Sequence, residues 1–496
     1  MSVIALLPET KSLIDRIKGA YIEGQHQATQ SDTTTSIFNP ATGDRIVVLG
    51  EAGPADVDLA VRSAHRHFEA GTWRNMRPAD RERILYKFSE VIAAHGEELA
   101  QLESWNQGKS IHLARAVEVG ASVEYIRYVA GLTTKITGLT LDVSIPFPPG
   151  ARFNVSTRRE PVGVVAGIAP WNFPMSISIW KILPALAAGC SIVLKPSEVT
   201  PLTAFRLAEL AIEAGVPPGV FNVVNGTGPV TGEALVRHPN IAKISFTGST
   251  AAGKRIGQVA LDRMARFSLE LGGKNPAVVL RDADLAKTIP GLLAGALFNS
   301  GQVCAAISRI YVDKAIYPAL LDGMSAAIRD MKLGAGLDES TQVAPLASAP
   351  HRDKVNAHVA AARASGLDLI QGGDVPERGY FVSPTLALGA DQNNALIREE
   401  VFGPVIALTA VDGADQAIHF ANDTKYGLAA SLWTESLSQA MDLIPRINAG
   451  TVWVNNHIPL DPNMPFGGFK ESGLGRDFGP NSLDAFTEIK SVCIAY

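Results

Sequence analysis

Val162-Gly-Val-Val-Ala-Gly-Ile-Ala169 is a short apolar run with no charged position, and the architecture follows from it. A second such run, Ser191-Ile-Val-Leu194, comes after the helical pattern of residues 177–188. Strands that are buried on both faces read as continuous apolar runs, and a helix between two of them makes a parallel β-α-β unit. Phe221-Asn-Val-Val224 and Lys243-Ile-Ser-Phe246 continue the alternation. The sequence therefore predicts an α/β fold with a doubly wound parallel sheet.

A second α/β unit is predicted further along the chain. Its strand candidates are short apolar runs between helical patterns, at 277–280, 309–312, 405–409, 430–433 and 451–454. Residues 54–130 carry an apolar repeat typical of helices, with Asp56 as a candidate N-cap. Two strand-like pieces, 141–155 around Pro148-Pro149-Gly150 and 488–496, fit neither unit.

The composition argues against nucleic-acid and membrane partners. The 496-residue chain has 44 basic and 49 acidic residues, a net charge of −5 and no run of like charges. No stretch approaches the roughly 18 apolar residues of a membrane span, and no secretory leader is recognisable. The three cysteines include no CxxC pair, so we expect no disulfide, no metal site and a cytoplasmic location.

Two segments carry groups for covalent catalysis. Phe298-Asn-Ser-Gly-Gln-Val-Cys304 presents a cysteine in a glycine-containing turn, and Leu269-Glu270-Leu271-Gly272-Gly273-Lys274 presents a carboxylate in a second glycine-rich loop. A nucleophilic thiol and a base that activates water are what a thioester cycle needs. The pair predicts acyl-enzyme chemistry. Cys190 and Cys493 have small or apolar neighbours, and we expect both to be buried, inert side chains.

Together with four further motifs, these segments resemble the NAD(P)-dependent aldehyde dehydrogenase superfamily, in order from about residue 38 to the C-terminus. The four motifs are Pro170-Trp171-Asn172-Phe173-Pro174, Lys195-Pro196-Ser197-Glu198, Phe246-Thr247-Gly248-Ser249-Thr250 and Glu399-Glu400-Val401-Phe402-Gly403-Pro404. The resemblance implies two doubly wound domains, one Rossmann-like for the cofactor and one catalytic, plus a small β element for oligomerisation.

The resemblance also implies domain limits. Residues 1–137 and 157–272 would form the NAD-binding domain, 273–470 the catalytic domain, and 138–156 with 478–496 the oligomerisation strands. Exposed strand edges pair readily with another chain. We therefore expect a homo-oligomer, a tetramer rather than a dimer.

NAD is the expected cofactor, although the usual GxGxxG fingerprint is absent. The turns 226–232 and 248–253 have other glycine spacings, and on spacing alone they could be ordinary turns. The resemblance assigns cofactor contacts to Ile168, Trp171, Lys195, Glu198, Gly228, Gly248, Ser249, Glu400 and Phe402. Glu198 would bind a free ribose hydroxyl and repel a 2′-phosphate, which favours NAD over NADP. Without the resemblance, residues 195–198 could be a helix start, and Glu400 and Phe402 a buried charge and a core ring.

The resemblance makes Cys304 the nucleophile that attacks the aldehyde carbon. Asn172 would donate its side-chain amide to the resulting oxyanion, alongside the backbone N–H of Cys304. Glu270 would deprotonate the water that hydrolyses the thioester, and its apolar neighbours predict a raised pKa. The alternative for Glu270 is a helix cap or a pair with a lysine.

Two further residues match family positions less securely. Lys181 falls in the hydrogen-bond network of the site, but it could also be a surface lysine. The family often has Glu where this chain has Asp477, which leaves a proton-relay role for Asp477 open.

The substrate pocket is expected to be apolar. The positions that line it by resemblance are Phe173, Ile177, Trp180, Val303, Ile458, Leu460 and Phe466. None is basic, which disfavours an aldehyde bearing a carboxylate, because a buried unpaired anion is costly. Segments 124–135 and 450–457 are similar to the bacterial phenylacetaldehyde dehydrogenases, so we expect oxidation of phenylacetaldehyde to phenylacetate.

Three alternatives stay open. The first is a broad-range aliphatic or amino-aldehyde dehydrogenase, which the pocket residues alone do not exclude. The second is a cysteine esterase, although no histidine partner is recognisable at a motif position. The third is a non-catalytic role.

Overall fold

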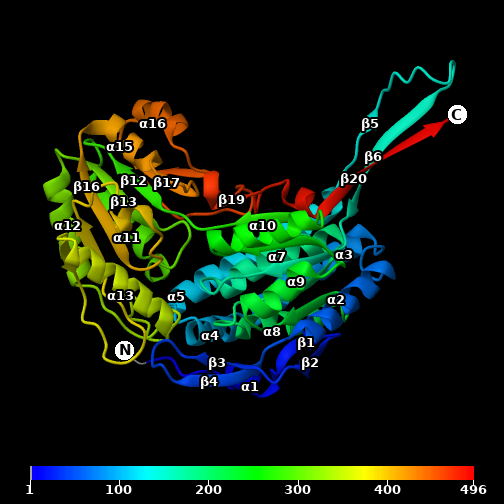
Figure 1. Cartoon of the computed structure of the whole chain (residues 1–496), viewed down its shortest axis with the longest axis horizontal. Helices are drawn as coiled ribbons and strands as arrows, with labels where there is room; N and C mark the ends of the chain where they lie inside the picture. The colour runs from blue at the N-terminus through cyan, green and yellow to red at the C-terminus, as the bar shows by residue number, and fades with distance from the viewer. Residues whose placement is uncertain (1–2) are drawn as a thin grey trace.

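The computed structural model describes residues 3–496, and within that range the chain forms two α/β lobes and a projecting arm (Figure 1). Each lobe is built on one mostly parallel sheet, and the arm on a small antiparallel sheet. The predicted α/β fold class is confirmed.

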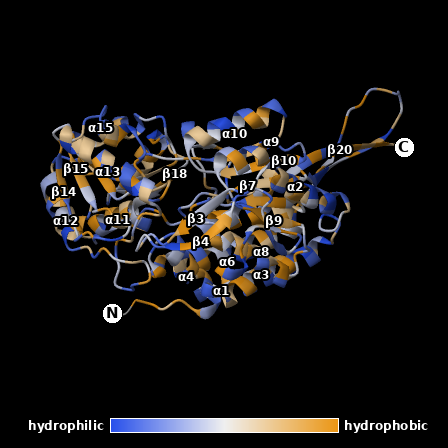
Figure 2. Ribbon diagram, turned by 60° about the horizontal axis from the view of Figure 1, so that its bottom comes forward, coloured by the Kyte–Doolittle hydropathy of each residue, from blue (hydrophilic) through white to orange (hydrophobic). Residues whose placement is uncertain are grey.

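The first sheet contains the apolar run of residues 162–169. In spatial order its strands are β19 (Gly473–Leu474), β11 (Arg266–Glu270), β10 (Ile241–Thr247), β7 (Val164–Ile168), β8 (Ser191–Lys195), β9 (Phe221–Val224), β1 (Gly19–Ile22) and β2 (Gln25–Ala28). The five strands from β11 to β9 run parallel, and β19, β1 and β2 are antiparallel additions at the edges. Figure 2 shows these central strands as hydrophobic ribbons between helices.

Helices cover both faces of this sheet because successive side chains of a strand point to opposite faces. Val165 of β7 packs into a core with helices α3, α4, α6, α7 and α8, whereas Val164 and Ala166 pack into a core with α2, α9 and α10. These helices are α2 (Pro54–Glu69), α3 (Pro78–Ala94), α4 (Gly96–Asn106), α6 (Ser122–Leu132), α7 (Pro174–Ala188), α8 (Leu202–Ala214), α9 (Glu233–Arg237) and α10 (Thr250–Asp262). Both sides of the sheet are thereby buried, as a doubly wound fold requires.

The second sheet repeats the pattern in the other lobe. Its order is β14 (Asp368–Gln371), β15 (Thr385–Leu388), β16 (Val405–Val411), β13 (Ile307–Asp313), β12 (Asn275–Val279), β17 (Ala429–Trp433) and β18 (Thr451–Val454). All neighbours are parallel except β14 with β15. Its helices are α11 (Leu285–Leu297), α12 (Tyr317–Arg329), α13 (Ala349–Ala364), α14 (Ala395–Arg398), α15 (Gly413–Asn422) and α16 (Leu437–Leu443). The chain passes from the first sheet to the second through residues 271–274, between β11 and β12.

The arm joins distant parts of the sequence. β6 (Phe153–Pro161) pairs along its whole length with the C-terminal β20 (Thr487–Ala495) and at two positions with β5 (Thr140–Leu141). The strand-like piece expected over 141–155 is present with other bounds, because β5 and β6 pair on either side of Pro148-Pro149-Gly150 but residues 142–152 form the connection between them. Cys493 lies exposed in β20, so the expectation of a buried side chain is also wrong, whereas Cys190 is buried.

Other elements differ from the expectations or were not predicted. Helix α2 begins at Pro54 after the N-cap Gly53, and Asp56 is its third residue, whose carboxylate accepts the Gly53 N–H at 2.9 Å. No strand was predicted before residue 54, yet β1 to β4 lie there, with β3 (Thr34–Phe38) and β4 (Arg45–Gly50) forming a hairpin. Further short helices include α1 (Pro8–Arg16), α5 (Ile111–Leu113) and the π-helical η1 (Ala114–Ala121) and η3 (Gly228–Gly232).

Candidate active site

The strand order of the first sheet creates a crevice at one place. From β7 the chain continues to β8 and β9 on one side, and later adds β10 and β11 on the other. The carboxyl ends of β7 and β10 therefore lie at a topological switch point, where open α/β sheets bind ligands. Ile168 ends β7 beside Phe246, and Gly248 and Ser249 follow β10 directly. Three of the predicted cofactor residues thus meet at this point.

The backbone at the switch point suits a phosphate group. Ser249 is the N-cap of the 13-residue helix α10, and its hydroxyl accepts the Ala252 N–H at 3.3 Å. The free N–H groups and the dipole at such a helix end favour an anion. Gly228 begins η3, and a Cβ built there would meet no atom within 4 Å, which leaves room beside the backbone.

Lys195 and Glu198 follow at the carboxyl end of the neighbouring strand. Lys195 is buried, and its ammonium donates to the carbonyls of Pro196 at 2.7 Å and Gly226 at 2.8 Å. The Glu198 carboxylate lies 3.6 Å from this ammonium and has 36% of its side chain exposed. The helix-start alternative is wrong, because helix α8 begins only at Leu202. Glu198 thus offers an open carboxylate next to the switch point.

Glu400 and Phe402 approach from the second lobe. Glu400 accepts the Gly273 N–H at 2.9 Å, and burial raises its pKa to about 7. Phe402 has a left-handed backbone, with φ 63°, and its ring packs edge-on to that of Trp171 with 5.3 Å between centroids. His351 fixes this geometry, because its Nε2 lies 2.8 Å from the Phe402 carbonyl oxygen and its ring is 4.8 Å from that of Trp171.

The Cys304 turn is shaped by its backbone. Asn299, Ser300 and Gly301 have φ values of 48°, 56° and 76°, an uncommon run of left-handed residues. Such strain persists only where the surroundings hold it in place. Here Asn275 Nδ2 donates to the carbonyls of Cys304 at 2.8 Å and Ala306 at 2.9 Å.

Further contacts hold the same turn. The Gln302 amide donates to the Asn299 carbonyl at 3.0 Å and accepts the Ala347 N–H at 2.9 Å. Gly273 lies so close to the turn that a Cβ on it would be 2.5 Å from the Cys304 carbonyl oxygen. The thiol is therefore presented by a rigid loop.

The Cys304 thiol is protonated at rest. Burial, followed by the Glu400 and Glu270 carboxylates, raises its pKa to about 12. A small cavity of about 20 Å³ next to the turn is lined by residues that include Val303, Glu400 and Phe402.

Asn172 lies beside the same turn. It is buried, and its side-chain Nδ2 donates to the Gln302 carbonyl at 3.0 Å. Its own carbonyl accepts from Asn299 Nδ2 at 2.9 Å. Since an amide nitrogen carries two hydrogens, one remains for a ligand next to Cys304.

Glu270 is the last residue of β11, a strand that the sequence analysis read as a loop. Its side chain is 5% exposed, lies between the buried Leu269 and Leu271, and neither carboxyl oxygen makes a hydrogen bond within residues 3–496. Burial and the Asp477 carboxylate raise its pKa well above the usual value. Both alternatives for Glu270 are wrong, because it ends a strand rather than capping a helix and no lysine pairs with it in the described chain.

Lys181 and Asp477 form a buried pair close to Glu270. Lys181 is 0% exposed, and its Nζ donates to Asp477 Oδ2 at 2.7 Å. The surface-lysine alternative is therefore wrong. The two charges act on Glu270 in opposite senses, since Lys181 lowers its pKa and Asp477 raises it.

Most of the predicted substrate residues belong to, or pack against, the hydrophobic core that Cys304 also contacts. Phe173, Ile177 and Phe466 belong to one buried cluster, and Trp180, Val303 and Cys304 pack against it. Ile458 and Leu460 do not belong to this cluster, and Leu460 is exposed.

Three aromatic rings that the sequence analysis missed complete the surroundings. Phe478 packs edge-on to Trp180 at 4.7 Å and to Tyr125 at 4.8 Å, and Phe298 stacks on Phe173 at 6.3 Å. The setting is apolar and aromatic.

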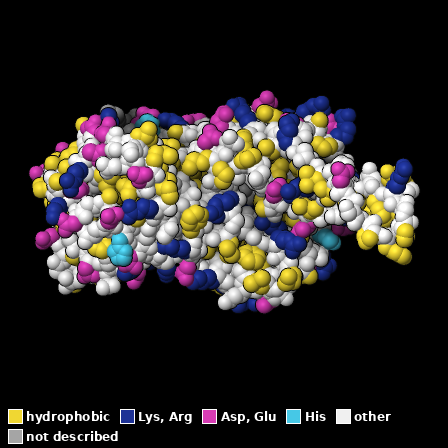
Figure 3. Space-filling view, turned by 90° about the horizontal axis from the view of Figure 1, so that it is seen from above, with side chains coloured by type: hydrophobic (Ala, Val, Ile, Leu, Met, Phe, Trp, Pro, Cys, Tyr) yellow, Lys and Arg dark blue, Asp and Glu magenta, His cyan; other side chains and the backbone are white. Residues whose placement is uncertain are grey.

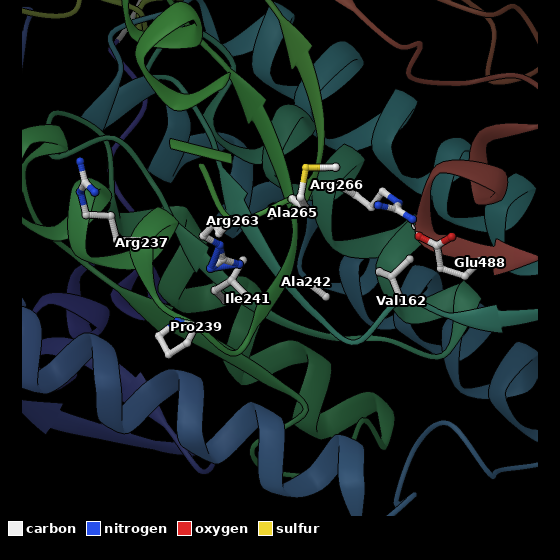
Figure 4. Close-up of a pocket in the computed structure, with 10 residues that line it drawn as sticks. Val162, Arg237, Pro239, Ile241, Ala242, Arg263, Ala265, Arg266 and Glu488 are labelled. Carbon is white, nitrogen blue, oxygen red and sulfur yellow. Dashed lines mark ion pairs between the residues drawn. The ribbon is translucent and has the colours of Figure 1, made fainter. Parts of the chain in front are cut away.

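A surface hollow of about 660 Å³, drawn in Figure 4, lies at the amino ends of β7 and β10, away from the switch point. Its arginines are engaged, with Arg266 paired to Glu488 and Arg237 to Glu233. Within residues 3–496, no cluster of three or more metal-ligating side chains occurs, and no helix is long and apolar enough to cross a membrane.

Comparisons with known proteins agree with this geometry. The model of the aldehyde dehydrogenase family matches residues 26–492. Phenylacetaldehyde dehydrogenase of Pseudomonas fluorescens is 46% identical over 96% of this chain and 95% of its own. Aminoacetaldehyde dehydrogenase of Pseudomonas aeruginosa is 42% identical over 97% and 96%. The NAD+ complex of an aldehyde dehydrogenase from Bacillus cereus superposes with a TM-score of 0.96 at 40% identity and covers 99% of both chains.

Proposed function

The chain belongs to the aldehyde dehydrogenase family, and we propose that it oxidises phenylacetaldehyde to phenylacetate with NAD. The observation that supports the choice of substrate is the apolar and aromatic core against which Cys304 packs. Phe173 and Phe466 belong to this core, Trp180 packs against it, and the predicted lining contains no basic residue. An aromatic side chain gains from such contacts, whereas a carboxylate would be buried without a partner. The 46% identity to phenylacetaldehyde dehydrogenase supports the same choice.

NAD fits the residues at the switch point. Ser249 would hold a phosphate at the start of α10, Lys195 and Glu198 the adenosine ribose, and Glu400 with Phe402 the nicotinamide end. When bound, NAD supplies the acceptor for the hydride that leaves the aldehyde carbon. The open carboxylate of Glu198 would repel a 2′-phosphate, which supports NAD over NADP.

The first step attaches the aldehyde to Cys304. Because the thiol pKa is raised to about 12, its proton must pass to a base, and Glu270 with its raised pKa is the group suited to take it. The sulfur then bonds to the carbonyl carbon while the C=O electron pair moves to the oxygen. The free hydrogen of the Asn172 amide stabilises that oxyanion, a contribution typically worth about 10²–10³ in rate.

The second step hydrolyses the thioester that remains after hydride loss. Once the proton taken from the thiol has passed to solvent, Glu270 as carboxylate removes a proton from water, and the hydroxyl oxygen bonds to the acyl carbon. The Cys304 sulfur then leaves as a thiolate, which takes the proton back from Glu270. The raised pKa of Glu270 makes it a stronger base than an ordinary carboxylate. Burial is the main cause of this raised pKa, and the buried Lys181–Asp477 pair adds two opposite effects, since Asp477 raises the pKa and Lys181 lowers it.

We further propose that the chain acts in the cytoplasm as a homotetramer. The arm projects from the body and shows hydrophobic side chains in Figure 3. Those exposed on the arm and its connections include Leu139, Leu141, Ile145, Phe147 and Ile494. Exposed apolar strands of this kind are suited to pair with other copies.

The test is NADH formation by the purified protein with NAD or NADP and a panel of phenylacetaldehyde, benzaldehyde, hexanal, succinic semialdehyde and aminoacetaldehyde. We expect kcat/KM to be highest for phenylacetaldehyde with NAD. Hexanal or aminoacetaldehyde at the top would establish the broad-range or amino-aldehyde alternative instead. Ester cleavage without cofactor, together with no NADH, would favour the cysteine esterase. Cys304→Ala is the control, and activity that survives in it would contradict the mechanism.

A further inference from the structure

A charged cluster is buried behind Asn172, outside the groups that the mechanism uses. It consists of Glu103 on α4, Lys109 in the following turn and Glu118 on η1, and each has 0% exposure. Lys109 forms an ion pair with Glu118, and its Nζ lies 3.6 Å from Glu103 Oε2. Removing such charges from water is unfavourable, and apolar residues of similar size often stabilise a core equally well. Stability alone does not explain the cluster.

Lys109 reaches the two residues that flank the reacting centre. Its Nζ donates to the Asn172 carbonyl at 2.9 Å and lies 4.4 Å from the ring centroid of Phe173. The same carbonyl accepts from Asn299 Nδ2, also at 2.9 Å. The peptide group between Asn172 and Phe173 is therefore held by two donors, one of them charged. A charge-assisted hydrogen bond is roughly twice as strong as a neutral one.

Glu118 holds Lys109 in place and is itself held by helix α7. One carboxylate oxygen of Glu118 accepts a hydrogen bond from the Lys109 ammonium, and the other accepts the Ser176 N–H at 2.7 Å. Ser176 lies in the first turn of α7, the helix that begins directly after Phe173. Glu118 stands in the π-helical segment η1, a form that is often found at functional sites. The cluster thus links η1, the Asn172 carbonyl and the start of α7.

We propose that Lys109, oriented by Glu118, is a positioning residue for the oxyanion donor Asn172 and for the Phe173 ring. The Asn172 side-chain amide has to point at the oxyanion that forms on the carbon bound to Cys304. The direction of this side chain depends on the Asn172 backbone, which Lys109 holds in place. The inference rests on the proposed function, because it presupposes that Asn172 stabilises the oxyanion.

A double-mutant cycle tests it, with Lys109→Met and Asn172→Ala singly and combined. Since a misplacement of about 1 Å can cost 10²-fold, we expect Lys109→Met to lower kcat and kcat/KM about 10- to 100-fold. KM for NAD should stay unchanged. In the Asn172→Ala background, Lys109→Met should cause no further loss. If the two losses multiply, Lys109 acts independently of Asn172 and the inference is overturned.

Two controls and a second variant complete the design. Arg81→Met removes another buried cation that donates to backbone carbonyls, but far from the site, and it should lower the thermal midpoint without lowering kcat. Glu103→Gln changes the cluster without touching Asn172 and should also leave kcat unchanged. If Lys109→Met does not fold, Glu118→Gln takes its place in the cycle with the same expectations.

The outcomes separate the two proposals. Loss of activity in Asn172→Ala but none in Lys109→Met would overturn the positioning role and leave the proposed function intact. Full activity in Asn172→Ala would overturn both.

Discussion

Replacing Gly467 by alanine tests whether the Glu270 carboxyl has to stay where the structure has it. Gly467 has φ +155°, and a Cβ built there would lie 2.6 Å from Glu270 Oε1. This is about 0.8 Å short of the 3.4 Å at which ordinary contact begins. On the other side the Gly475 carbonyl lies 2.9 Å away, so the new methyl group has no free direction. We expect the Glu270 side chain to move by most of that distance.

Displacing a catalytic group by about 1 Å can cost 10²-fold in rate, so we expect Gly467→Ala to slow thioester hydrolysis about 10- to 100-fold. Formation of the thioester should slow less, because it needs Glu270 only to take the thiol proton, which solvent can also accept. Stopped-flow absorbance with phenylacetaldehyde and NAD should then show a burst of NADH close to the enzyme concentration, followed by a slow steady state.

Gly366→Ala is the matched control for backbone strain. Gly366 has φ +84°, and a Cβ there meets nothing within 4 Å. Both substitutions place alanine in a conformation that costs roughly 1–3 kcal/mol, so both should lower the thermal midpoint. Only Gly467→Ala should change the burst. A folded Gly467→Ala enzyme with the wild-type steady-state rate would refute the dependence of hydrolysis on the position of Glu270.

Three further outcomes are expected. Asp477→Asn removes a carboxylate that raises the Glu270 pKa, so the acid limb of the plot of kcat against pH should move to lower pH. An acid limb at the wild-type pH would rule out the coupling between Asp477 and Glu270. Glu400→Gln removes a carboxylate that raises the Cys304 pKa, so iodoacetamide should label Cys304 faster at alkaline pH. Mass spectrometry of the Cys304 peptide measures the labelling rate, and an unchanged rate would contradict the coupling between Glu400 and Cys304. Glu198→Gln removes the charge that would repel a 2′-phosphate, so the ratio of kcat/KM for NADP to that for NAD should rise about tenfold. A constant ratio would show that Glu198 does not select the cofactor.

The central strands could be predicted because burial on both faces leaves them no polar positions. β7 and β8 are examples, since every residue of each is buried. β11 was missed because its sequence, Arg-Phe-Ser-Leu-Glu, alternates polar and apolar residues and so lacks the continuous apolar run by which the central strands were found. β1 is apolar throughout, but it joins the sheet beside β9, about 200 residues away along the chain. No local sequence pattern predicts a partner strand that is so distant along the chain.

The site residues also divide into those that the sequence could predict and those that it could not. Cys304 and Glu270 stand in glycine-containing segments whose chemistry can be read locally. Asn275 and His351 could not be found by this reasoning, because each acts by a side-chain contact with the backbone of a distant segment, Asn275 with the Cys304 carbonyl and His351 with that of Phe402. Likewise, the inward direction of Glu118 depends on a π-helical segment, which residue periodicity does not reveal.

The glycines around Cys304 act through the space they leave rather than through flexibility. A Cβ on Gly272 would collide with the Glu400 carboxyl, one on Gly273 with the Cys304 carbonyl, and one on Gly467 with Glu270. Each glycine therefore lets a polar group lie directly against the backbone. Burial of this kind raises the pKa of both carboxyls and, through their charges, that of the thiol. The glycine pattern thus keeps the thiol protonated at rest and Glu270 basic enough to accept its proton.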